Sequence, residues 1–265
     1  MANVTSKDGT TIAYDQQGAG PAVILVDGAM GYRSFGKAPE LAGLLAPHFS
    51  VTTYDRRGRG ESGNTEPFAV EREIEDIEAL MSVTGGSAYL YGISSGACLC
   101  LEAALKLGRK VGKLAMYEPP YDSDPVVQQT WKNYRKDLAE ALAAGRRGDA
   151  VALFMRQVGV PAEQIDGMRH APMWPMLEAV APTLPYDAAD IGEDRTVPVS
   201  RAARLTMPVL VMDGGANLTM MPFMGATAAA LAKAIPHAQR RTLEGQTHDV
   251  DSKVLAPVLI EFFSQ

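Results

Sequence analysis

The sequence predicts an α/β fold built on a mostly parallel sheet, and three observations support this class. Short runs of β-forming residues alternate with helical stretches, as they do in parallel sheets. The run "AVILVDG" at 22–28 is continuously apolar, which is typical of a strand buried on both faces. The segment 121–206 has no buried strand pattern, and prolines break its amphipathic pieces. We therefore expect a core formed by residues 1–120 and 207–265, with a helical cap inserted at 121–206.

The remaining elements of the core follow from residue periodicity. Residues 10–18 alternate apolar and polar side chains, as an antiparallel strand does, and 50–62 is a strand that enters a Gly-rich loop. Residues 70–84 carry apolar side chains at a helical spacing. Further strands are expected at 87–92, 113–120, 208–214 and 238–245, and further helices at 94–107, 227–235 and 254–265.

The composition limits the function classes. The chain has 265 residues with a net charge of −6, which argues against nucleic acid as a partner, because phosphate binding needs a basic face. No apolar run approaches the ~20 residues that span a bilayer, and the first residues lack the apolar core of a secretory signal. Cys98 and Cys100 fall on different faces of an expected helix, which favours reduced thiols over a disulfide or a metal site. We expect a cytoplasmic monomer or homodimer without metal or cofactor.

The pentapeptide "GISSG" at 92–96 predicts a catalytic nucleophile. It has the pattern G-x-S-x-G and lies between an expected strand and an expected helix, which is the context that this motif needs. A sharp strand-to-helix turn strains the serine backbone, and glycines on either side relieve the crowding. The hydroxyl then stands at a helix N-terminus, where the dipole favours developing negative charge. The glycine spacing favours Ser94 over Ser95 as the nucleophile.

Five stretches in a fixed order resemble the α/β-hydrolase superfamily over nearly the whole chain. They are "VDGAMG" at 26–31, "YDRRGRGES" at 54–62, "GISSG" at 92–96, "PVLVMDGGAN" at 208–217 and "GQTHDV" at 245–250. The resemblance implies an eight-stranded, mostly parallel sheet flanked by helices, with a helical cap over a catalytic triad. These motifs are specific for the superfamily and not for a substrate.

The resemblance also implies the catalytic base. His248 lies between the last expected strand and the last helix, in the loop that carries the catalytic histidine of the resembled family, and it follows the serine in chain order. His48 and His237 lie between helices and strands, at expected surface positions, and His170 lies in the insertion. We therefore predict His248 as the base.

The acid of the triad is the least conventional part of the sequence. The usual family position falls on Asn217, whose amide carries no charge to stabilise an imidazolium. Glu118 instead ends the strand beside the nucleophile strand, and it resembles the acid of haloalkane dehalogenases and of zearalenone lactonases. The latter also combine a "DG" loop, an "SSG" elbow and a glutamate at this strand end. We predict Glu118 as the acid, and a catalytically dead protein remains the alternative.

Three other carboxylates near the predicted site are weaker candidates for the acid. Asp213 falls too early, inside its strand, and Asp249 cannot easily turn back onto the ring of its neighbour. Asp251 begins the pattern "DSKV" and is expected to cap the last helix.

Two backbone donors are expected to form the oxyanion hole. One is the N–H of Ser95, the residue after the nucleophile, and the other is the N–H of Ala29 in the loop "DGAMG". Asp27 replaces the histidine usual in the family, and we expect it to brace the loop through hydrogen bonds. Asp55 is expected to organise the next turn, whose arginines we interpret as solvated: Arg56, Arg57 and Arg59.

The insertion is expected to lie over Ser94 as a lid. Its apolar and methionine-rich side chains favour a medium-sized, mostly uncharged acyl substrate. The residues that we expect to bind the substrate are Met30, Trp174, Met220 and Met221.

The sequence therefore predicts a metal-free serine hydrolase that acts on a small-molecule ester or lactone. A carbon–carbon bond hydrolase or a perhydrolase would use the same triad, and a non-catalytic receptor on this fold would bind a ligand without turnover. An enzyme that displaces halide or opens epoxides is disfavoured, because it needs an aspartate nucleophile at position 94.

Overall fold

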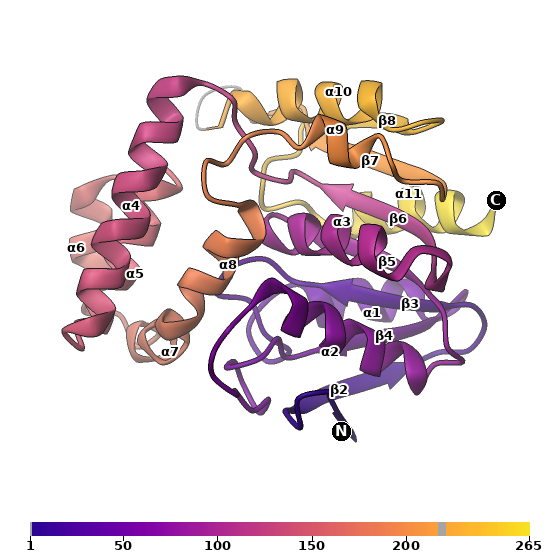
Figure 1. Ribbon diagram of the computed structural model, residues 1–265, viewed down its shortest axis with the longest axis horizontal. Coiled ribbons are helices and arrows are strands. Elements are labelled where there is room, and N and C mark those ends of the chain that lie inside the picture. The colour runs from indigo at the N-terminus through magenta and orange to yellow at the C-terminus, as the bar shows by residue number, and fades with distance from the viewer. Residues whose placement is uncertain (1, 217–220) are drawn as a thin grey trace.

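The computed structural model describes residues 2–216 and 221–265 (Figure 1). Within these residues an eight-stranded sheet has the order β1-β2-β4-β3-β5-β6-β7-β8. The pairs β1–β2 and β2–β4 are antiparallel, and the other pairs are parallel. The strands are β1 (Ala2–Thr5), β2 (Thr11–Gln17), β3 (Ala22–Val26), β4 (Ser50–Tyr54), β5 (Ala88–Ile93), β6 (Val111–Tyr117), β7 (Val209–Gly214) and β8 (Gln239–Leu243). This arrangement confirms the expected fold class.

Helices cover both faces of the sheet. Strand β3 shows why, because its side chains alternate between two apolar cores: Val23 and Leu25 face one, and Ile24 and Val26 face the other. Helices α1 (Ala38–Leu45) and α11 (Ser252–Ser264) pack on the first face. Helices α2 (Val70–Ser82), α3 (Ser95–Leu107) and α10 (Phe223–Ala234) pack on the second. The sheet is therefore buried on both sides, as its apolar strands require.

The chain between β6 and β7 is helical and contains no strand in the structure. Helices α4 to α7 stand to one side of the sheet in Figure 1, and α8 returns along α3. The short α9 packs on α10, so the end of the insertion contacts the core. The bounds are α4 (Pro125–Ala143), α5 (Arg147–Gln157), α6 (Ala162–Met168), α7 (Trp174–Val180), α8 (Leu184–Ile191) and α9 (Val199–Ala202). We call α4 to α8 the cap.

Two elements were missing from the sequence-based expectation. Strand β1 is short and largely exposed, so it has no apolar pattern to find. Helix α1 is signalled by Pro39 in its first turn and by Leu41, Ala42 and Leu45 on its buried side.

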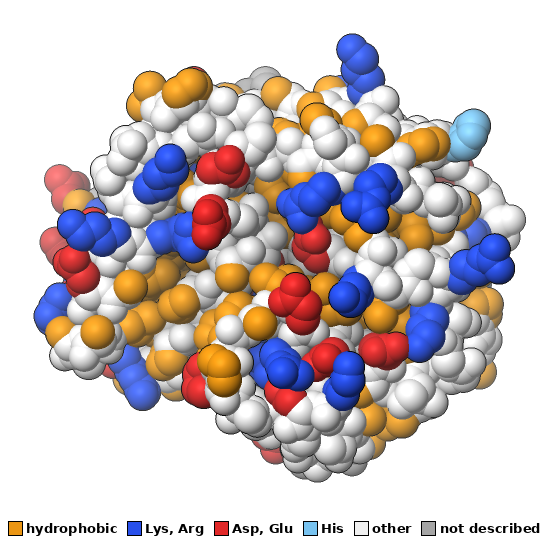
Figure 2. Space-filling view, in the orientation of Figure 1, with side chains coloured by type: hydrophobic (Ala, Val, Ile, Leu, Met, Phe, Trp, Pro, Cys, Tyr) orange, Lys and Arg blue, Asp and Glu red, His pale blue; other side chains and the backbone are white. Residues whose placement is uncertain are grey.

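The surface charge and the hydrophobicity of the helices can be compared with the expectation of no nucleic-acid or membrane partner. On the face seen in Figure 2, basic and acidic side chains are interspersed, and no broad basic patch is visible. Among the described residues, no helix is both long and apolar enough to cross a bilayer.

Candidate active site

Ser94 occupies the turn between β5 and α3. Its backbone has φ of 57° and ψ of −129°, a conformation that is costly for a residue with a side chain. The flanking glycines are required by close packing: a Cβ on Gly92 would lie 2.4 Å from the carbonyl oxygen of Gly96, and one on Gly96 would lie 2.3 Å from that of Val26. The chain around Ser94 therefore has the sharp turn that the G-x-S-x-G pattern predicts.

His248 and Glu118 are in direct contact. Glu118 follows β6, whose last residue Tyr117 pairs with Ile93 of the nucleophile strand. Its side chain is fully buried, and its Oε2 lies 2.6 Å from Nδ1 of His248. The other carboxylate oxygen accepts a hydrogen bond of 2.8 Å from the N–H of Gly214. Glu118 itself has a positive φ of 47°, so the backbone is strained at the predicted acid, as it is at Ser94.

The loop that carries His248 is fixed by neighbouring strands. The hydroxyl of Tyr117 donates to the carbonyl of Thr247 at 2.5 Å. The N–H of Ala216, just after β7, donates to the carbonyl of Gln246 at 2.9 Å. These bonds connect the histidine loop to the ends of β6 and β7, so Glu118 and His248 are held by the same sheet edge.

The competing carboxylates have other partners. Asp213 pairs with Arg240 at 3.1 Å and accepts from Thr242. Asp249 pairs with Lys37 at 2.7 Å. Asp251 accepts from the N–H of Lys253 and caps α11, which confirms that expectation. Asn217 lies outside the described residues.

The other three histidines are exposed and lie outside the cavities at Ser94. His48, His170 and His237 all have exposed side chains, and none of them lines a cavity that contains Ser94.

Two backbone N–H groups next to Ser94 are uncommitted. Within residues 2–216 and 221–265, neither the N–H of Ser95 nor that of Ala29 has a hydrogen-bond acceptor. The loop that carries Ala29 packs directly on the nucleophile, since a Cβ on Gly28 would lie 2.9 Å from Cβ of Ser94. Paired donors of this kind suit a developing oxyanion. No hydrogen bond joins Ser94 to His248 in the described part of the chain, and such catalytic contacts commonly tighten only in the substrate complex.

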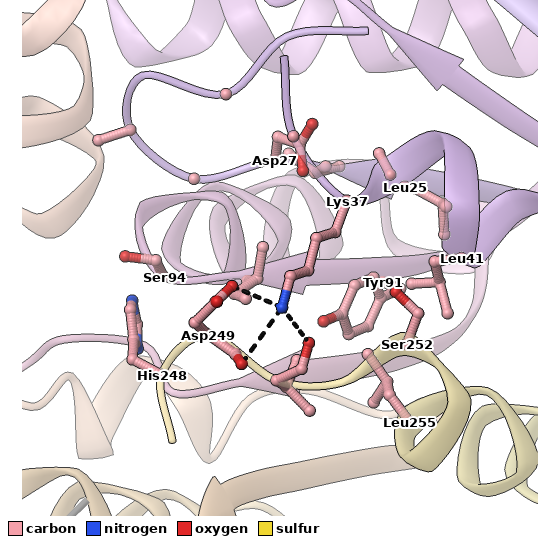
Figure 3. Close-up of a pocket in the computed structure, with 18 of the residues that line it drawn as sticks. Leu25, Asp27, Lys37, Leu41, Tyr91, Ser94, His248, Asp249, Ser252 and Leu255 are labelled. Carbon is pink, nitrogen blue, oxygen red and sulfur yellow. Dashed lines mark hydrogen bonds and ion pairs between the residues drawn. The ribbon is translucent and has the colours of Figure 1, made fainter. Parts of the chain in front are cut away.

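Two cavities meet at Ser94 and His248. The lateral cavity, of about 380 Å³, extends between α1 and α11 beside β3 (Figure 3). The cap cavity, of about 150 Å³, lies under α4, α5 and α8. Besides Ser94 and His248, the two cavities share Ala29, Phe154 and Val158. A bound molecule can therefore extend from the nucleophile in two directions.

The expected substrate-binding residues fall in different places. Met221 lines the cap cavity, and Met220 lies outside the described residues. Met30 has a positive φ of 68° and packs in the apolar core, so the expectation that it enters the pocket is corrected. Trp174 is likewise corrected, because its buried indole donates to Glu178 on its own helix and lines neither cavity.

Aromatic side chains of α4 and α5 line the cap cavity. Phe154 of α5 lies where the two cavities meet, and Trp131 and Tyr134 of α4 line the cap cavity. The sequence alone could not assign these positions, because the cap cavity forms only where α4, α5 and α8 pack over Ser94.

Comparison with known proteins identifies the family. A sequence model of the alpha/beta hydrolase family matches residues 18–255. The chain belongs to this family. An alpha/beta hydrolase from Sphaerobacter thermophilus DSM 20745 has 49% identity and a TM-score of 0.87, over 99% of this chain and 100% of its own. An enol-lactonase from Burkholderia xenovorans LB400 has a TM-score of 0.72 over 100% of both chains, but at 21% identity it shows a shared fold alone.

Curated relatives match over a shorter stretch. An uncharacterized hydrolase from Bacillus subtilis (strain 168) is 34% identical over 115 residues, which are 42% of this chain and 42% of the relative. The match thus spans less than half the length of that protein.

A buried charge network lies behind the loop of residues 27–31 and corrects the interpretation of Arg56, Arg57 and Arg59 as solvated. Arg56, Arg57 and Arg59 are all at most 1% exposed. Arg57 is held by Asp8 and Asp76. The arginines are buried because carboxylates on α2 and α8 pair with them. The sequence of the turn alone does not show these contacts.

This network connects the cap to the loop of residues 27–31. Asp187 of α8 accepts from Arg56, from Arg59 and from the hydroxyl of Ser95, each at 2.7 Å. Arg59 also donates to the carbonyl of Gly28 at 2.7 Å. One cap carboxylate thus contacts Ser95 directly and reaches the loop of Ala29 through Arg59.

Asp27 differs from the expectation that it braces its loop through hydrogen bonds. Its carbonyl oxygen accepts from Arg56 at 3.3 Å, but its carboxylate has no hydrogen-bond donor among residues 2–216 and 221–265. Burial raises the pKa of Asp27 to about 6, and Arg59 and Arg56 offset this effect only in part. The carboxylate packs against Gly31 and Gly36 of its own loop, and together they line the lateral cavity.

The raised pKa of Asp27 predicts a pH-dependent stability cost. The folded protein loses this proton near pH 6, whereas the unfolded chain loses it near pH 3.8. The native state therefore binds the proton more tightly, and stability falls as the pH rises from about 4 to 6. About two pKa units correspond to roughly 3 kcal/mol. Asp27→Asn should raise the free energy of urea unfolding by about 1–3 kcal/mol at pH 8 and by little near pH 4. An equal gain at both pH values would contradict a buried, titrating Asp27.

Proposed function

We propose that this alpha/beta hydrolase is a serine hydrolase that cleaves an ester or lactone of a medium-sized, mostly apolar molecule. Ser94 is the nucleophile, His248 the base and Glu118 the acid in this proposal. The N–H groups of Ser95 and Ala29 form the oxyanion hole. The apolar walls of both cavities support an uncharged organic substrate over a sugar or a phosphate.

The reaction follows from these assignments. The Ser94 hydroxyl adds to the substrate carbonyl and its proton passes to Nε2 of His248, while Glu118 holds Nδ1 and stabilises the imidazolium. The carbonyl oxygen becomes an oxyanion between the two backbone donors. As the tetrahedral intermediate collapses, the carbon–oxygen bond to the alkoxide breaks, and His248 protonates that alkoxide. Water then attacks the acyl-enzyme, gives a proton to His248, and releases the acid and free Ser94.

One observation carries the proposal: the 2.6 Å contact between Nδ1 of His248 and Oε2 of the buried Glu118. A carboxylate at this nitrogen fixes the tautomer in which Nε2 accepts a proton. Asp213 and Asp249 cannot take this role while they pair with Arg240 and Lys37.

Labelling with a fluorophosphonate tests the nucleophile. The intact protein should form a covalent adduct on the peptide that contains Ser94, detected by mass spectrometry, and lose esterase activity in proportion. Ser94→Ala is the control and should remain unlabelled, whereas Ser95→Ala should still be labelled. Folded protein with an unmodified Ser94 would reject the proposal.

A further inference from the structure

The lateral cavity has apolar walls that lead away from the nucleophile. In Figure 3, Ser94 and His248 lie at one end, and Leu41 and Leu255 lie at the other. These leucines and Leu25 are at most 4% exposed, so the cavity runs into the core between α1 and α11. Its volume of about 380 Å³ is within the range of sites for small molecules.

Polar groups without protein partners line this apolar cavity. They are the carboxylate of Asp27, the hydroxyl of Tyr91 and the hydroxyl of Ser252, which belong to the end of β3, to β5 and to α11. Tyr91 and Ser252 are 4% and 2% exposed. Within the described residues, none of these side-chain groups makes a hydrogen bond. None of the three groups is among the fully buried side-chain atoms that lack a partner, so their polar atoms are accessible from the cavity, where a ligand can supply their hydrogen bonds.

The chemistry of these groups selects the ligand. An ionised Asp27 only accepts hydrogen bonds, whereas the hydroxyls of Tyr91 and Ser252 both donate and accept. A hydroxyl group on the ligand can donate to Asp27 and accept from either hydroxyl. An anionic group would be repelled by Asp27. A cationic group on the ligand would be repelled by the ammonium group of Lys37, which lies at the wall of the same cavity.

We propose that the lateral cavity binds one arm of the substrate, an apolar arm that carries a hydroxyl group facing Asp27, Tyr91 and Ser252. The other arm of the ester or lactone occupies the cap cavity. This inference rests on the proposed function, since Ser94 and His248 lie where the two cavities meet. It narrows the substrate class to esters or lactones of hydroxylated, otherwise apolar molecules.

Paired substrates test the hydroxyl group. A panel of alkyl and aryl esters is assayed beside the same esters with a hydroxyl added at successive positions. At least one hydroxylated ester should have a kcat/KM about 10-fold or more above its parent, which corresponds to one or two hydrogen bonds. Asp27→Asn should reduce this ratio by about 10-fold, and Tyr91→Phe or Ser252→Ala by about 3-fold each. Tyr54→Phe, which removes a buried, unpartnered hydroxyl that lines neither cavity, should leave the ratio unchanged. A panel with no preference for a hydroxyl, or a preference that survives all three variants, would overturn the inference.

Filling each cavity separately tests the two-arm arrangement. Ala38→Leu narrows the lateral cavity from α1, and Ala188→Leu narrows the cap cavity from α8. Two ester series are compared, one varied in the acyl chain and one in the alcohol. Each variant should shorten the longest chain accepted in one series, and the two variants should affect different series. If Ala38→Leu changes neither series, or both variants shorten the same one, the arrangement is wrong.

A binding measurement separates failure of this inference from failure of the proposed function. Ser94→Ala cannot form the acyl-enzyme but keeps both cavities, so calorimetry with the preferred hydroxylated ester and its parent reports binding without turnover. The hydroxylated ester should bind about 10-fold more tightly. Labelling of Ser94 together with equal affinities would reject only the hydroxyl subsite. Unequal affinities without labelling or turnover of the intact protein would reject only the hydrolase mechanism.

Discussion

Glu118→Gln should lower kcat for ester hydrolysis by about 10³–10⁴-fold with a much smaller change in KM, because replacing the acid of a triad by its amide has an effect of this order. The glutamine is nearly isosteric, so it can still contact His248 and the N–H of Gly214. It no longer carries the charge that stabilises the imidazolium. Steady-state kinetics on one activated ester, with the thermal midpoint as a check of folding, measures this effect.

The matched control is Asn217→Ala, at the position where the family usually places its acid. This variant should keep kcat within a few-fold, since an amide at position 217 supplies no charge to lose. A comparable loss in both variants, or a larger loss at position 217, would move the acid away from Glu118. The two substitutions together therefore decide whether the acid of the triad follows β6 or β7.

The proposed catalytic residues could be predicted from the sequence because each is tied to a local pattern. Ser94 has glycines at fixed distances on either side, and His248 precedes the signal that starts the last helix. Glu118 required one additional step, namely that the ends of parallel neighbours β5 and β6 meet at the same sheet edge. Their contact is a consequence of sheet order, which the motif order already implied.

The binding residues could not be found in the same way, because they depend on packing between distant segments. Trp174 is apolar and lies in the insertion, but its indole is turned toward Glu178 and away from the site. The turn at Arg56 and Arg59 appears solvated until α8 brings Asp187 and Asp190 against it. Both aspartates are more than 120 residues from these arginines in the chain, so no local pattern could reveal this contact.

Substitution by asparagine should destabilise the protein to different extents at two aspartates of α8, Asp187 and Asp190. Burial alone would raise the pKa of Asp187, but Arg59 and Arg56 outweigh that effect and hold the pKa below its usual value. Burial raises the pKa of Asp190 well above its usual range, and the neighbouring Glu73 adds to the shift. The Oδ1 atom of Asp190 is buried with no hydrogen-bond partner in the described residues. Asp187 pairs with both Arg56 and Arg59, which favour its charged form, whereas Asp190 pairs with Arg56 alone and its charged form is disfavoured by burial.

Asp187→Asn should accordingly lower the free energy of unfolding by about 3–5 kcal/mol, because it leaves a buried guanidinium charge without compensation. Asp190→Asn removes a carboxyl group whose charged form is already disfavoured and which pairs with one arginine only, so it should cost less, about 1 kcal/mol. Urea unfolding at pH 7 measures both changes. Ser95→Ala, which loses only the hydroxyl bond to Asp187, should also cost about 1 kcal/mol and separates that bond from the ionic contacts. Similar costs for the two asparagine variants would mean that the network does not hold its charge on Asp187.

If the network does hold its charge there, Asp187→Asn should also impair catalysis in the fraction that stays folded. Asp187 contacts the side chain of Ser95 and anchors Arg59, which in turn binds the carbonyl of Gly28 beside Ala29. Loosening these contacts displaces both proposed oxyanion donors, which are needed in the transition state more than for substrate binding. We therefore expect kcat to fall by at least 10-fold while KM changes little, measured below the unfolding transition. A rise in KM with an unchanged kcat would instead place Asp187 among the residues that only shape the cap cavity.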